Sequence, residues 1–332
     1  MLAIRLQHLI LLIIAISGVV VWSLGLSIPH WVIVTPFVIS LVAYGISHGS
    51  ADHVIWSAIS KRSCRSRDLT RTVVWYLAIM SGYALLWSVS PKAGAIIFLL
   101  MTMWHWGSAD AYESAKSFSR PMSGFPFAIL SMARSVVPLI TPLILHRPMY
   151  EQVLSSLAGE SAAAQIMSAL PSPAIAIALL AGSVFVHLSM SVRFQGSVGK
   201  ESVKATLLVL LFLFTPPIAS IGAYFCLWHG VGHQDRLKTW YRRFNVISQT
   251  GRKLSYDQFA ITGLLLLGVA FLIAFVDPGV VSLANYLILI SVLTMPHMIV
   301  VWKMDFCELG RGLNRFISPW RDESVEHPAG CA

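Results

Sequence analysis

Long apolar stretches alternate with short polar connections from the N-terminus to about residue 302. Most of these stretches approach or exceed the roughly 20 residues that an α-helix needs to cross a bilayer. Lipid offers backbone groups no hydrogen-bond partners, so spanning segments of this kind form helices. The pattern therefore predicts an all-α, polytopic transmembrane helical bundle. The apolar segments are 9–26, 31–59, 72–90, 92–112, 124–145, 173–192, 203–233, 258–276 and 281–302.

Two clusters of basic residues, within 61–71 and 236–253, predict the topology. Short cytoplasmic loops collect Lys and Arg, so we expect both clusters on the cytoplasmic side. Five apolar segments lie between them, and one of these must therefore fail to cross. Two adjacent prolines make 203–233 the first candidate, and 124–145, with three prolines, is the alternative. Either choice gives about eight crossings of the plasma membrane, with both termini cytoplasmic.

The connections hold no Ser/Gly linker or low-complexity block that would divide the chain into domains. We expect one transmembrane catalytic domain over residues 1–305 and a polar C-terminal tail over 306–332. The first apolar run lacks a small-x-small cleavage site and is interpreted as an uncleaved first transmembrane helix.

Composition supports the membrane assignment. Only 12% of the 332 residues are charged and 56% are hydrophobic, whereas soluble domains carry about 25% charged residues. A soluble enzyme is thereby excluded. The formal net charge of +9 fits basic loops on an anionic leaflet, and no basic tract interleaved with aromatic residues suggests a nucleic-acid partner. The four cysteines have no C-x-x-C spacing, so a thiolate metal site is not indicated.

Histidines inside the apolar segments carry the candidate chemistry. Ionisable groups are costly at membrane depth and are kept mainly where they bind or react with something. One such histidine would usually be a hydrogen-bonded packing residue, but a set on several helices predicts metal or cofactor binding. The predicted topologies also place the whole set in the cytoplasmic half of the membrane, at one level. The set is His48, His105, His229, His233 and His297.

Spacing within the chain favours a shared site. His229 and His233 are four residues apart, on one face of an ideal helix. Asp52 follows His48 by four residues and could accept its ring N–H, which fixes the ring orientation of a metal ligand. Asp110 follows His105 by five residues and is less well placed for that role.

A short motif also recurs without a fixed period. It reads His-Gly-Ser-Ala-Asp over 48–52, His-Trp-Gly-Ser-Ala-Asp over 105–110 and, more loosely, His-Gly-Val-Gly-His-Gln-Asp over 229–235. Several side chains near these motifs are expected to orient a ligand or to line a substrate pocket. They are Asp52, Asp110, His297, Trp104 and Trp228.

Imidazole ligands without thiolates suit iron, copper or zinc, and open positions on Fe(II) suit O2 chemistry. The single H-x-x-x-H pair fits a mononuclear site better than a di-iron site, which would need more histidine boxes. Motifs for serine hydrolases, nucleotide binding and zinc proteases do not occur.

Four motifs occur in a fixed order along the chain. They are Gly45-x-x-His48-Gly49-x-x-Asp52-His53, Trp104-His105-Trp106-Gly107-x-x-Asp110, Phe225-Cys226-Leu227-Trp228-His229-x-x-x-His233 and Pro296-His297. Their combination resembles the Brp/Blh family of integral-membrane β-carotene 15,15'-dioxygenases, over about residues 44–305. The resemblance implies a non-haem iron enzyme that uses O2 to split the central double bond of β-carotene into two retinal molecules.

By motif matching, the resemblance assigns Fe(II) to His48, His105, His229 and His233, with no catalytic residues beyond these ligands. The expected partners are β-carotene or a similar carotenoid, O2 and the lipid bilayer, and a retinal-binding rhodopsin is a candidate acceptor of the product. Alternatives from the residues alone are another membrane carotenoid or lipid oxidase, a bis-histidine haem membrane protein and a metal transporter.

Overall fold

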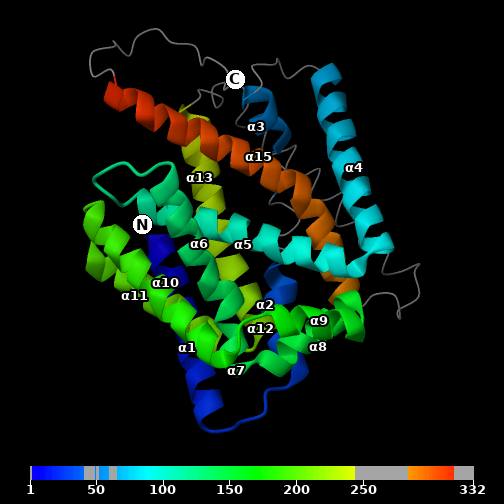
Figure 1. Cartoon of the computed structure of the whole chain (residues 1–332). Coiled ribbons are helices and arrows are strands. Elements are labelled where there is room, and N and C mark those ends of the chain that lie inside the picture. Colours follow the sequence, from blue (N-terminus) through cyan, green and yellow to red (C-terminus); the bar gives the residue numbers. More distant parts are fainter. Residues whose placement is uncertain (1, 41–48, 50–51, 60–65, 244–282, 318–332) are drawn as a thin grey trace.

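The computed structural model describes residues 2–40, 49, 52–59, 66–243 and 283–317. Every regular element in these ranges is a helix, which confirms the all-α prediction. Figure 1 shows α5 and α15 crossing the middle of the molecule, with α4 at one edge and α10 and α11 at the opposite edge. The elements are α1 (Leu2–Ser23), α2 (His30–Ser40), α3 (Asp52–Ile59), α4 (Ser66–Val89), α5 (Pro91–Ala115), α6 (Phe125–Ile140), α7 (Pro142–Leu145), α8 (Arg147–Ala158), α9 (Glu160–Ala169), α10 (Pro173–Arg193), α11 (Val198–Phe214), α12 (Pro217–Tyr224), the π-helix η2 (Phe225–His229), α13 (Gly230–Arg243) and α15 (Leu283–Ile317).

Several helices have the length and hydropathy of membrane spans. Large apolar side chains lie exposed along α1, α4 and α10, among them Ile13, Leu77 and Phe185. Such faces are suited to lipid rather than water. The structure therefore indicates a membrane protein. Within the described ranges, the five candidate spans are Leu6–Ser23, Thr70–Val89, Phe125–Leu145, Pro173–Arg193 and Leu287–Asp305.

The predicted break in segment 203–233 is present. The helix α11 ends at Phe214, and α12 begins at Pro217 directly after Pro216. Proline lacks a backbone N–H and therefore interrupts the helical hydrogen bonds at this point. In contrast, 124–145 keeps the character of a single candidate span, although α6 and α7 meet at Thr141. The count of eight crossings and the cytoplasmic termini stay predictions, because segment 258–276 lies outside the described residues.

Glycines allow two pairs of helices to approach at backbone distance. A Cβ at Gly107 of α5 would collide with the carbonyl oxygen of Ser131 in α6. A Cβ at Gly222 of α12 would likewise collide with the backbone of Phe37 in α2. Small residues at helix crossings are a common device of membrane proteins. The first crossing lies two residues from His105, so it helps to fix that histidine.

The last described helix, α15, continues past residue 306 to Ile317. The predicted start of the polar tail therefore lies within a helix. Residues 318–332 are outside the described ranges, and the division into a catalytic domain and a tail stays a prediction.

Candidate metal centre

Four histidines from four elements lie side by side. The ring centroids of His105 (α5) and His229 (η2) are 5.0 Å apart, and those of His105 and His297 (α15) are 5.4 Å apart. His233 (α13) extends the series, with its ring centroid 5.2 Å from that of His297. All four side chains are buried. The structure therefore brings together the four described members of the predicted set, which we call the histidine cluster.

The fifth member of the predicted set, His48, lies outside the described residues. Its neighbour Gly49 is described, and a Cβ built on Gly49 would approach Asp52 Oδ2 at 3.3 Å and His297 Nδ1 at 3.6 Å. The backbone next to His48 in sequence therefore lies against two side chains of the site.

Asp52, at the start of α3, contacts His297 across a long sequence separation. Its Oδ2 atom lies 2.8 Å from His297 Nδ1 and also accepts a hydrogen bond from the Tyr76 hydroxyl of α4. Asp52 and His297 are both buried. We call these three residues the Asp52 anchor. The predicted contact of Asp52 with His48 stays a prediction, whereas its contact with His297 was not foreseen.

A π-helical turn carries His229. The N–H of Gly230 donates to the carbonyl of Phe225, five residues earlier, instead of four as in an α-helix. Such turns are rare and often lie at functional sites. Aromatic rings surround His229, because its ring centroid is 5.5 Å from Phe225, 5.9 Å from Tyr224 and 6.3 Å from Trp106. Trp104, a predicted pocket residue, is half-buried on the same helix as Trp106.

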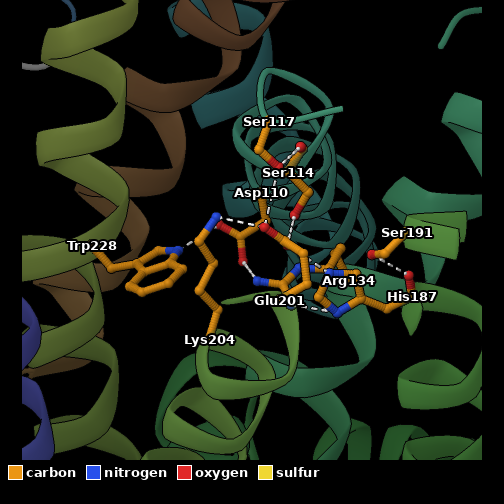
Figure 2. A network of polar contacts seen from close by, with 9 residues as sticks. All are labelled: Asp110, Ser114, Ser117, Arg134, His187, Ser191, Glu201, Lys204 and Trp228. Carbon is orange, nitrogen blue, oxygen red and sulfur yellow. Dashed lines mark hydrogen bonds and ion pairs between the residues drawn. The ribbon is translucent and has the colours of Figure 1, made fainter. Parts of the chain in front are cut away.

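Asp110 connects the helix of His105 to the turn of His229. Its Oδ1 atom accepts hydrogen bonds from Tyr224 Oη and Trp228 Nε1, each at 3.0 Å. Its Oδ2 atom accepts from Arg134 Nη2 of α6 at 3.2 Å. Figure 2 shows this carboxylate between Trp228 on one side and Arg134 on the other. We call these four residues the Asp110 anchor. It holds Tyr224, which directly precedes the π-helical turn, and Trp228 inside that turn. The role of Asp110 in orienting a ligand stays a prediction.

The Asp110 anchor continues into a second group of buried charges. Arg134 Nη1 lies 3.2 Å from His187 Nδ1, and His187 Nε2 lies 2.9 Å from Glu201 Oε2. Because a guanidinium group can only donate, His187 accepts through Nδ1 and donates to Glu201 through Nε2. Figure 2 also shows Ser114, Ser117 and Lys204 around the Glu201 carboxylate, with Lys204 Nζ 2.7 Å from Oε1. Opposite charges are thus matched along the network.

A third polar contact joins the three helices that carry His105, His233 and His297. Arg236 of α13 forms an ion pair with Asp305 of α15, and its guanidinium carbon lies 4.1 Å from the ring centroid of Tyr112 in α5. Arg236 and Asp305 are buried. This contact holds α5, α13 and α15 together beside the cluster.

The three ring separations in the cluster agree with those of imidazoles on one metal ion. Two imidazoles bound through nitrogens about 2.1 Å from a metal have ring centroids roughly 4.6 to 6.5 Å apart. The observed separations of 5.0 to 5.4 Å lie in this interval. Imidazole nitrogens also suit iron, so the donor set fits. The described donors alone, without His48, contain no set of three His, Cys, Asp or Glu side chains closed around one point.

The sequence predicted the histidines of the cluster, but it did not predict most of the contacts that fix their positions. The network of Arg134, His187 and Glu201 was not predicted, although Arg134 interrupts an apolar segment and is itself a signal. The π-helical turn leaves no comparable signal, since its residues read as an ordinary apolar helix.

The sequence of the chain matches a family of known proteins. The family model described as Beta-carotene 15,15'-dioxygenase matches residues 39–305, which is most of the chain. The chain belongs to this family. As a member of this family it is an oxygenase enzyme. The matched region includes every histidine of the predicted set and both aspartate anchors.

Relatives match over nearly their full length. The chain is 28% identical to the Probable beta-carotene 15,15'-dioxygenase Blh of Halobacterium salinarum, over 85% of this chain and 87% of the relative. It is 23% identical to the protein of the same organism named Brp, over 92% and 83% of the two chains. It is 22% identical to the Beta-carotene 15,15'-dioxygenase of the uncultured marine bacterium 66A03, over 79% and 90%. No solved structure matches the chain significantly.

Proposed function

We propose that the protein is a membrane-embedded, iron-dependent dioxygenase that cleaves the central double bond of β-carotene to give two retinal molecules. The observation that carries the proposal is the buried histidine cluster, within a chain that belongs to the β-carotene 15,15'-dioxygenase family. The names of the relatives supply the substrate and the bond. The cluster supplies a donor set suited to the metal.

His105, His229 and His233, together with His48, would hold Fe(II) through neutral imidazole nitrogens. Bound iron would supply the activation of O2. The chain's own residues exclude water from this position, because the four described rings are buried and aromatic side chains surround His229. The Asp110 anchor fixes the turn that carries His229, and Arg236 fixes the helices that carry His105 and His233.

The substrate chemistry agrees with an apolar, buried site. β-Carotene is uncharged and dissolves in the bilayer, so it can reach such a site from the side of the lipid. An apolar site holds a polyene mainly through shape and aromatic contact. Phe225, Tyr224 and Trp106 provide aromatic surface next to His229. The position of the polyene relative to this surface would select the double bond that is cleaved.

The atoms and electrons of the reaction balance without another reactant. Breaking one C=C bond and forming two C=O bonds consumes one O2, so that each aldehyde product receives one oxygen atom. The double bond is oxidised and O2 is reduced. The overall reaction requires no proton and no external reductant, so an acid–base residue beside the metal is not needed.

Expression in cells that accumulate β-carotene tests the proposal. Extraction and chromatography should detect retinal, and the purified protein should contain non-haem iron. His229→Ala should abolish retinal formation and lower the iron content, while His146→Ala, outside the cluster, should change neither. Retention of wild-type iron and turnover by His229→Ala would show that the ligand assignment is wrong.

Other outcomes identify the alternatives. Apocarotenals of other lengths would indicate a different carotenoid oxidase. A Soret band without non-haem iron would indicate a bis-histidine haem protein. Metal uptake by cells without carotenoid cleavage would indicate a transporter.

A further inference from the structure

We propose that His297 is a further ligand of the metal, with the Asp52 anchor holding its ring in the binding orientation. This inference rests on the proposed function and deepens it, because the resemblance to the family assigns the metal to four other histidines. It concerns a side chain that sequence reasoning placed in an orienting or pocket-lining role.

The position of the ring is the first argument. His297 lies between two proposed ligands, with its centroid 5.4 Å from that of His105 and 5.2 Å from that of His233. The rings meet at interplanar angles of 81° and 75°, so His297 does not stack on either neighbour. Edge-to-face rings at this separation match imidazoles arranged around one ion.

The contact of Nδ1 is the second argument. Metal-binding histidines commonly donate one ring N–H to a carboxylate, which leaves the other nitrogen for the metal. His297 Nδ1 lies 2.8 Å from Asp52 Oδ2. Donation from Nδ1 leaves a lone pair on Nε2, the nitrogen on the other side of the ring. The Tyr76 hydroxyl fixes the same carboxylate oxygen, so the orientation of the imidazole is fixed as well.

The charge of Asp52 is the third argument. A buried carboxylate is stable only when it is hydrogen-bonded and its charge is compensated. The described partners of Asp52 are a phenol and an imidazole, neither with a permanent positive charge. Asp110, equally buried, has the guanidinium of Arg134. A metal dication bound to His297 would supply the compensating charge for Asp52 through the imidazole.

Metal binding to purified protein tests the inference independently of turnover. The apoprotein in detergent is titrated with Fe(II), and Co(II) is used as a probe whose absorption spectrum reports the ligands. We expect His297→Gly to lower the Fe(II) affinity by at least about tenfold and to change the Co(II) spectrum. Added imidazole should restore the spectrum by replacing the missing donor, which a purely structural residue would not allow. His146→Gly is the matched control and should behave as wild type.

The outcomes separate this inference from the proposed function. Unchanged affinity and spectrum in His297→Gly, together with metal loss in His229→Ala, would overturn the role of His297 alone. Failure of the wild-type protein to bind any metal would overturn both. Size-exclusion chromatography verifies folding, and if His297→Gly aggregates, Asp52→Asn is measured instead. An unchanged Co(II) spectrum in folded Asp52→Asn would then contradict the inference.

Discussion

The Asp52 anchor and the Asp110 anchor come from copies of one short motif, yet the structure uses them differently. In each copy the aspartate follows a Gly-Ser-Ala sequence. Asp52 contacts His297 directly, whereas Asp110 contacts Tyr224, just before the π-helical turn, and Trp228, next to His229 inside it. One carboxylate therefore orients a ring of the histidine cluster, and the other orients the turn that presents a ring. Similar local sequence does not imply an equivalent role.

The compensation of charge also differs between the anchors. Asp110 is paired with Arg134, and the network continues through His187 to Glu201 and Lys204. The third, looser copy of the motif ends in Asp235, which pairs at the surface with Lys238 at 3.4 Å. The Asp110 anchor should thus matter mainly for folding, and the Asp52 anchor mainly for metal binding.

Arg134→Met is expected to have the largest effect. It removes the charge partner of the buried Asp110, and breaking a buried pair in this way costs about 3 to 5 kcal/mol. The thermal midpoint of the protein in detergent should fall, with a smaller monodisperse fraction. The double variant Asp110→Asn with Arg134→Met should recover part of the loss, since no unpaired charge remains. Wild-type stability of Arg134→Met would show that the network does not stabilise the fold.

The glycines of the two motifs give the next comparison. Gly107→Ala forces a methyl group onto the Ser131 carbonyl in α6, and overpacking of this kind costs about 1 to 3 kcal/mol. A methyl group at Gly49 meets Asp52 Oδ2 at 3.3 Å, which a small shift can relieve. In thermal unfolding, the midpoint should therefore fall clearly for Gly107→Ala and by less for Gly49→Ala. Equal losses would contradict the assigned difference between the two sites.

Asp52→Asn should leave the fold intact and weaken metal binding. The amide keeps the size of the side chain but lacks the negative charge that supports His297. Changes to residues that orient a ligand typically lower metal affinity by about 10- to 100-fold. Fe(II) titration measures the affinity, and thermal unfolding of the apoprotein checks stability. A large loss of apoprotein stability without a change in affinity would assign Asp52 a structural role.

Tyr76→Phe should have the smallest effect. It removes one hydrogen bond to Asp52 and leaves the contact with His297, so the free energy of unfolding should fall by about 1 kcal/mol. Fe(II) affinity should fall only a few-fold. Tyr224→Phe removes the corresponding hydrogen bond to Asp110 and should lower the thermal midpoint more than the affinity. If Tyr224→Phe lowered mainly the Fe(II) affinity and Tyr76→Phe mainly the thermal midpoint, the different roles assigned to the two anchors would be wrong.

The sequence allowed prediction of the helical class, the proline break and the grouping of the histidines. These depend on composition, on local backbone chemistry and on the cost of polar groups in lipid. The partners of Asp52 and Asp110 could not be predicted, because His297 and Trp228 lie more than a hundred residues away in sequence from the aspartates that they contact. Helical spacing suggests only partners within a few residues, as for His48 and Asp52.

The π-helical turn affects the direction in which side chains point from the helix axis around His229. An α-helix advances by about 100° per residue, and a π-helical turn accommodates one extra residue without disturbing the helix on either side. Removing one residue from 225–228 would therefore restore an ordinary α-helix and leave the helices on either side in their present rotational phase. Tyr224 would then still face Asp110. The H-x-x-x-H spacing of His229 and His233 would also be preserved, so the extra residue changes only which side chains of the turn lie next to the first histidine.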